Sequence, residues 1–135
     1  DFDSFSRGVM GEFYDMANAA QRAEFQTAFK ATLVDLYTSA LVASVITDMS
    51  LRETVRASDT SANVIVSVAT QDGSSYVVQY SMRQDASGSW KARNIILDGV
   101  NIGLTYRNQF KSAMETENGD LARVIRIWPE LIDGA

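Results

Sequence analysis

The chain has 135 residues, of which 46% are apolar and 21% charged, a composition typical of a folded domain rather than a disordered segment. Its net charge of −5 disfavours binding to nucleic acid and lasting adhesion to an anionic membrane surface. The absence of Cys and His excludes disulfides, His- or Cys-based catalysis and the usual zinc sites.

One proline and eight glycines leave no Pro/Gly-rich linker, so we expect a single domain over residues 1–135. The chain opens on Asp1-Phe2-Asp3, with neither an initiator Met nor a signal peptide. This start predicts a mature or trimmed chain from which an export signal has been removed. No stretch approaches the roughly 20 apolar residues of a membrane-spanning helix.

Helical spacing dominates the first third of the chain. Residues from about Phe2 to Met16 favour a helix, and Asn18 is placed to cap a second, stronger one. Apolar residues recur every four positions in that second segment: Phe25, Phe29, Leu33, Tyr37 and Leu41, with Leu36 and Val45 beside them. The pattern extends well beyond twenty residues, so we expect a kink or break near Thr38-Ser39.

The middle of the chain predicts an antiparallel sheet. Four segments are rich in β-branched and aromatic residues: Leu51 to Ala57, Asn63 to Thr70, Tyr76 to Gln84, and Ser89 to Leu97. Short separators of turn-forming residues indicate hairpins between them. Alternation assigns apolar residues to one face of the second and third strands: Val64, Val66 and Val68, then Tyr76, Val78, Tyr80 and Met82.

Helical spacing returns after Asp98-Gly99, where Ile102, Tyr106, Phe110 and Met114 step by four. Asn118-Gly119 is predicted to end this helix, Asp120 to cap a last one, and Pro129 to limit it. The order predicts an α+β fold with a four-stranded antiparallel sheet and helices before and after it. If the sheet curves strongly, an apolar space suited to an acyl chain can remain beside it.

Few residues are candidates for catalysis. Asp98 stands at a strand-to-helix junction, where a turn and a cap explain it, and Tyr80 has no evident acid or base partner. We therefore expect no catalytic residue, no metal and no cofactor. Two alternatives stay open at this point: a small cone-shaped α+β enzyme with an acid or base deep in its cavity, and a ligand-free interaction domain with a solid core.

Two blocks of sequence resemble the MlaC family, also called toluene-tolerance proteins. The more specific block runs from Trp90-Lys91 through Asp98-Gly99-Val100 to Tyr106-Arg107-Asn108-Gln109-Phe110. The earlier block contains Val9-Met10-Gly11, Phe13-Tyr14 and Gln21-Arg22, and the long helix follows it. The chain departs from the family pattern at four positions: Tyr14 stands for Trp, Arg93 for an aromatic residue, Asn94 for Asp and Asn101 for Ser.

The resemblance implies a strongly curved sheet with helices, enclosing an apolar cavity for a phospholipid, and family members have further helical sequence before this chain's start. It implies a periplasmic carrier, not an enzyme, that shuttles lipid between an outer-membrane lipoprotein complex and an inner-membrane ABC transporter with its substrate-binding MCE-domain protein. The expected cargo is a phospholipid. The expected lipid-binding residues are Phe29, Leu33, Leu36, Val64, Val66, Val68, Val78, Tyr80, Met82, Tyr106 and Phe110. The expected headgroup or partner residues are Arg83, Lys91, Arg93 and Arg107.

Overall fold

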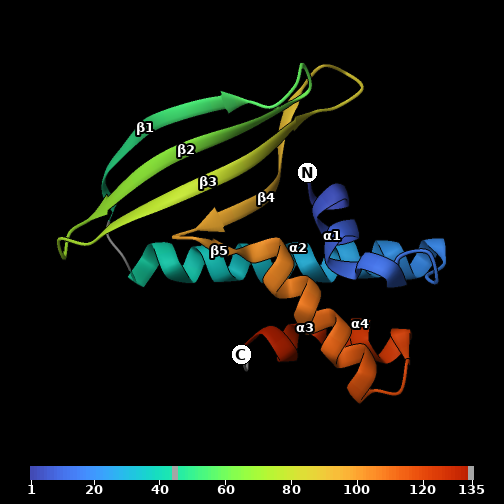
Figure 1. Ribbon diagram of the computed structural model, residues 1–135. Coiled ribbons are helices and arrows are strands. Elements are labelled where there is room, and N and C mark those ends of the chain that lie inside the picture. Colours follow the sequence, from blue (N-terminus) through green and yellow to red (C-terminus); the bar gives the residue numbers. More distant parts are fainter. Residues whose placement is uncertain (44–45, 134–135) are drawn as a thin grey trace. The chain divides into compact units, whose positions relative to one another are not determined.

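The computed structural model describes residues 1–43 and 46–133 (Figure 1). Contacts divide the chain into two compact units. The sheet unit comprises Asp1 and Ser39–Ile102, and the helical unit comprises Phe2–Thr38 and Gly103–Ala135. The expectation of a single domain over the whole chain stays a prediction.

The sheet unit is an antiparallel meander, with strands in sequence order. In the described part of the chain five strands form it: β1 (Ile46–Arg56), β2 (Ser61–Thr70), β3 (Ser75–Gln84), β4 (Trp90–Leu97) and β5 (Val100–Asn101). The antiparallel class is confirmed, but the predicted count of four was one too few. The two residues of β5 are too short to produce a recognisable alternation. Strand β1 also begins before the predicted Leu51.

Figure 1 shows the strands of this sheet bending and twisting together. The register shifts within β1, between Ile46 and Asp48 and between Leu51 and Glu53. A third shift separates the pairs that Ser81 and Met82 make with β4. Such irregularities bend a strand and increase its local twist, so they explain curvature that a regular alternation would not produce.

The helical unit begins with α1 (Phe2–Met10) and a short 3-10 turn, η1 (Gly11–Phe13). The predicted cap of the next helix, α2 (Ala19–Ala43), is confirmed. The Gln21 N–H donates to Asn18 Oδ1 at 2.8 Å, and the Asn18 N–H donates to Gln21 Oε1 at 3.0 Å. This reciprocal pair satisfies two N–H groups that the helix itself cannot.

Helix α2 continues through Thr38 and Ser39, so the expected break at this point is wrong. The boundary between the two contact units falls between the same two residues. The side chains of Tyr37 and Leu41, and the whole of Val45, lie outside the described residues.

Two further helices follow the sheet, α3 (Ile102–Thr116) and α4 (Leu121–Asp133). Asn118 and Gly119 take the positive φ angles of a helix end, 56° and 79°, and Asp120 Oδ1 accepts the Arg123 N–H at 3.1 Å. Both predictions are confirmed.

No helix within residues 1–43 and 46–133 combines the length and apolar character needed to cross a membrane.

Pro129 lies inside α4, so the prediction that it limits this helix was wrong. Proline in a helix interior removes one hydrogen bond and costs about 3 kcal/mol. The helix is nevertheless fixed before and after this point by side chains that are buried or half-buried. These are Leu121, Val124, Ile125 and Trp128 before the proline, and Leu131 and Ile132 after it.

Candidate functional site

The strand register gathers the predicted apolar residues of the sheet on one face. Val64 lies opposite Tyr80, and Val66 lies opposite Val78. Directly paired residues of antiparallel strands project from the same face, so the alternation predicted from sequence is confirmed. The register extends this set across β1 to β4, and we call it the apolar face: Met49, Leu51, Ala62, Val64, Val66, Val68, Tyr76, Val78, Tyr80, Met82, Ala92, Ile95 and Leu97.

Much of this apolar face remains accessible to solvent. Leu51 is 66% exposed, Met49 57% and Leu97 41%, whereas Val78 near the centre is 8% exposed. A contiguous exposed apolar surface is unfavourable in water, and it commonly marks a binding surface. The apolar face is therefore the strongest candidate site in the sheet unit.

Sequence reasoning missed the part of the apolar face that β1 and β4 supply. Met49 and Leu51 project from this face. After the register shift between Leu51 and Glu53, the residues of β1 that project from the same face are Thr54 and Arg56. A simple period of two therefore fails along β1. Short apolar alternations were present in the sequence, as Met49-x-Leu51 and as Ile95-x-Leu97. Neither segment shows by itself which strand it pairs with.

The face opposite the apolar face is mixed in character. Ser67, Gln79 and Ser81 project from it, and so do Ile65 and Val77. Neighbouring polar side chains interact across its strands. Asn94 Nδ2 donates to Asn101 Oδ1 at 2.9 Å, and these are two of the residues at which the chain departs from the family pattern. The two departures are therefore in direct contact.

The predicted lipid-binding residues of the helices lie in an aromatic cluster within the helical unit. Phe29 and Phe110 are 1% and 0% exposed, and the rings of both lie within 6.4 Å of the Trp128 ring, centroid to centroid. Tyr106 meets Phe29 edge to face at 5.9 Å, and its burial raises the pKa of the phenol. These residues form a hydrophobic core, which is the ordinary role of apolar residues at helical spacing. Their contact with lipid stays a prediction.

The two remaining helical candidates differ in burial. Leu33 is 5% exposed, whereas Leu36 is 49% exposed. A large exposed apolar side chain next to a buried one on the same helix widens the apolar stripe beyond the packed core. Leu36 therefore remains available for a ligand or a partner, and its assignment stays a prediction.

Arg107 brings the two sequence blocks of the family resemblance together. Its side chain lies against Gly11, where an added Cβ would be 2.8 Å from Arg107 Nε. The Phe13 and Phe110 rings lie 6.0 Å apart in the same region. A surface pocket of about 330 Å³ is lined by Met10, Gly11, Glu12, Phe13, Leu104, Arg107, Asn108 and Lys111. Arg107 thus lines a surface pocket of the helical unit.

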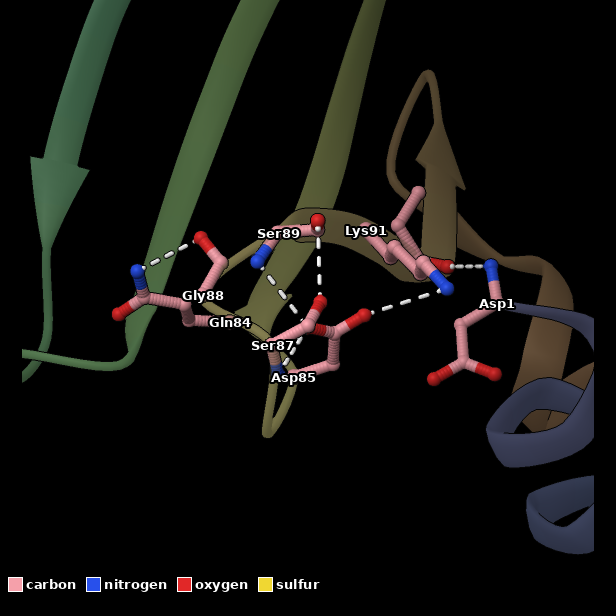
Figure 2. Close-up of polar contacts among 8 residues, drawn as sticks. Asp1, Gln84, Asp85, Ser87, Gly88, Ser89 and Lys91 are labelled. Carbon is pink, nitrogen blue, oxygen red and sulfur yellow. Dashed lines mark hydrogen bonds and ion pairs between the residues drawn. The ribbon is translucent and has the colours of Figure 1, made fainter.

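The other basic candidates lie on β3 and β4. Arg83 and Lys91 are register partners on the face opposite the apolar face, and Arg93 falls at the irregularity between Asn94 and Ala92. Lys91 Nζ is 3.2 Å from Asp85 Oδ2 in the turn that joins the two strands (Figure 2). Their roles toward a headgroup or a partner stay predictions.

The β3–β4 turn is organised by the carboxylate of Asp85. Asp85 Oδ1 accepts the Ser87 hydroxyl at 2.6 Å and the Ser87 and Ser89 N–H groups at 2.9 and 3.0 Å (Figure 2). The Ser87 hydroxyl, followed by the Ser89 N–H and Lys91, holds the pKa of Asp85 well below its usual range. The terminal amine of Asp1 donates to Ala92 O in the same region. This arrangement explains Asp85 as a structural residue of the turn.

The two residues considered for catalysis, Asp98 and Tyr80, lie in a turn and on the apolar face. Asp98 has a φ of 47° in the β4–β5 turn, and its Oδ1 accepts the Val77 N–H at 2.8 Å. Tyr80 is half-buried on the apolar face. Across the described ranges no three acidic side chains group together to hold a metal ion.

The antiparallel sheet with its exposed apolar face, and the helices that precede and follow it in the chain, define a small α+β protein. The chain belongs to the MlaC protein family, whose model matches residues 1–130. The resemblance drawn from the two sequence blocks is therefore confirmed.

Two proteins illustrate this relationship. The toluene tolerance protein ttg2D of Pseudomonas putida is 33% identical over 129 residues, which are 95% of this chain and 60% of that protein's length. The phospholipid-binding protein of Ralstonia solanacearum, solved in complex with a phospholipid, matches 99% of this chain and 74% of its own with a TM-score of 0.84. At 24% identity this second likeness establishes the fold.

Proposed function

We propose that this chain binds a phospholipid on the apolar face of its sheet and carries it through the periplasm. The proposed route runs between an outer-membrane lipoprotein complex and an inner-membrane ABC transporter with its substrate-binding MCE-domain protein. The observation that carries the proposal is an apolar face, continuous across β1 to β4, in a member of the MlaC family. The solved relative from Ralstonia solanacearum, itself a phospholipid-binding protein, supports the choice of ligand.

The dimensions of the apolar face suit an acyl chain. From Ala62 to Val68 the strand rise gives a length of roughly 20 Å. One leaflet of a bilayer contributes about half of the ~30 Å hydrocarbon thickness, so a chain has room to lie along the strand. The side chains along this length are hydrocarbon, aromatic or thioether groups, as an acyl chain requires.

Energetics favour a carrier with a sheltered apolar surface. A diacyl lipid has about 30 methylenes, and at ~0.8 kcal/mol each their exposure to water would cost over 20 kcal/mol. Moving the chains from one apolar environment to another avoids most of that cost. We propose that the lipid is cargo, that the chain is not an enzyme, and that the residues predicted on the helices also bind lipid.

A pair of substitutions on adjacent residues tests the role of the apolar face. Val66→Asp places a carboxylate among the acyl chains, and burying an unpaired charge there costs several kcal/mol. We expect bound phospholipid per protein to fall at least tenfold, as measured by solvent extraction and mass spectrometry. Ser67→Asp is the matched control, because Ser67 is next in sequence but projects from the opposite face.

The control should retain wild-type lipid, and circular dichroism should show both variants folded. If folded Val66→Asp retains its phospholipid, the apolar face is not the binding surface. Equal loss in both variants would also contradict the proposal, because it would show that charge anywhere on β2 is sufficient.

A further inference from the structure

An arginine that sequence reasoning did not select lies at one end of the apolar face. Arg56 is the register partner of Ala62, and Ala62 in turn pairs with Met82. Trp90 begins β4 and projects from the same face, two residues before Ala92. The Arg56 guanidinium carbon lies 5.6 Å from the centroid of the Trp90 ring. This contact agrees with the register, which places both side chains on one face.

The Arg56 guanidinium retains free capacity for an anion. Its Nη2 donates to the Asp59 carbonyl oxygen at 3.1 Å, which uses one of five N–H donors. Within the two described stretches no carboxylate forms a salt bridge with Arg56. Arg56 is exposed, and Trp90 is 39% exposed beside it.

The register separates Arg56 from Arg83 and Lys91, two of the residues predicted to meet a headgroup or a partner. Arg83 and Lys91 project from the opposite face, and Lys91 is already paired with Asp85. Of the basic residues that the register assigns to a face, Arg56 is the one on the apolar face. A headgroup attached to chains on that face therefore meets Arg56 before it meets Arg83 or Lys91.

We propose that Arg56 and Trp90 bind the phosphodiester of a glycerophospholipid whose acyl chains lie on the apolar face. This proposal rests on the proposed function and adds the recognition of phosphate to it. A guanidinium binds phosphate oxygens through two parallel hydrogen bonds, and it is the side chain best matched to that geometry. Trp suits the boundary between apolar and wet surroundings, and its ring face holds the cation in place.

The test compares uptake of two lipids, of which one carries a phosphodiester headgroup and the other carries none. The wild type, Arg56→Gln and Arg83→Gln are incubated with mixed vesicles of phosphatidylglycerol and diacylglycerol that carry the same acyl chains. Each protein is re-isolated, and its lipids are extracted and quantified by mass spectrometry. Arg83→Gln is the matched control, since it removes the same charge from the opposite face of the same sheet.

We expect the wild type and Arg83→Gln to prefer phosphatidylglycerol. In Arg56→Gln this preference should fall about tenfold, equivalent to ~1.4 kcal/mol. An unchanged preference in Arg56→Gln, or an equal fall in Arg83→Gln, overturns the assignment of Arg56 alone. A wild type that binds neither lipid overturns the proposed function, and this inference with it.

If Arg56→Gln does not fold, two measurements on the wild type test the role of Arg56. The preference should weaken from low to high NaCl, because an exposed guanidinium is screened by salt. A preference that does not change with salt contradicts the role of Arg56. Millimolar inorganic phosphate should leave the preference in place, since the phosphodiester is held together with its chains. A preference erased by inorganic phosphate overturns the proposal and assigns Arg56 to a free-anion site.

Discussion

Both the backbone conformation and the nearby Arg107 side chain favour glycine at position 11. Its φ of 56° lies in the left-handed region, and Arg107 occupies the space that a side chain would need. An alanine in this conformation costs about 1–2 kcal/mol, whereas the guanidinium is the far end of a flexible side chain and can move. The backbone conformation is therefore the larger of the two effects.

We predict that Gly11→Ala lowers the free energy of unfolding by about 1–2 kcal/mol, and by nearly the same amount in an Arg107→Ala background. Urea unfolding at constant slope measures both values. Gly8→Ala is the control, because Gly8 lies in α1 with open space around it. That change should raise stability by up to ~1 kcal/mol through helix propensity. Equal effects of the two substitutions would contradict this account.

Asn94 and Asn101 depart from the family pattern, and the structure explains both departures by a contact between them. Each was notable by itself in the sequence, as an amide where the family has Asp and Ser. Their side chains hydrogen-bond to each other between β4 and the short strand β5. Sequence could not reveal this pairing, because β5 was not predicted.

The β3–β4 turn is an element whose stability depends on pH. The pKa of Asp85 is depressed in the folded chain, chiefly by the Ser87 hydroxyl. A depressed carboxyl pKa contributes stability that is present above the unfolded pKa, about 3.9, and is lost as pH falls through the lower folded value. The contribution should therefore be complete at neutral pH and fade in acid.

We predict that Asp85→Ala is less stable than the wild type at neutral pH, and that the difference shrinks as pH falls below about 4. Urea unfolding across this range measures the difference. Lys91→Gln removes the ion pair alone, and its effect should be smaller because Lys91 is exposed. A difference between Asp85→Ala and the wild type that does not change with pH would exclude the carboxylate as its source.

At the scale of elements, local chemistry made most of the fold predictable. The caps at Asn18 and Asp120 and the helix end at Asn118-Gly119 depend on neighbouring residues alone, and all were predicted correctly. Errors arose where distant residues decide the outcome. Packing on both sides of Pro129 sustains α4, and pairing with β2 sets the true start of β1.

At the scale of the whole molecule, the candidate site was predictable only in part. Alternation within β2 and β3 identified their apolar residues, because each strand pairs regularly with the other. The contribution of β1 depended on register shifts, which no local pattern encodes. Arg56 was missed for the same reason, since its face is fixed by pairing with Ala62 rather than by its neighbours in sequence.

Binding of lipid can be assigned to this chain alone, whereas shuttling between membrane complexes is proposed for the whole protein. The chain covers 60% of the length of the Pseudomonas putida relative that it matches. Binding on the apolar face concerns residues within this chain, so it can be tested on this chain directly. Shuttling between membrane complexes is a proposal for the whole protein, and its test requires those partners.

The most direct test of phospholipid binding is the identity of what the chain carries when purified without detergent. The protein is extracted with organic solvent and the extract identified by mass spectrometry, while native mass spectrometry gives the stoichiometry. We predict phospholipid in near-stoichiometric amount, with chain lengths that match the apolar face. Folded protein that is free of lipid, and that takes up none from phospholipid vesicles, would contradict the account.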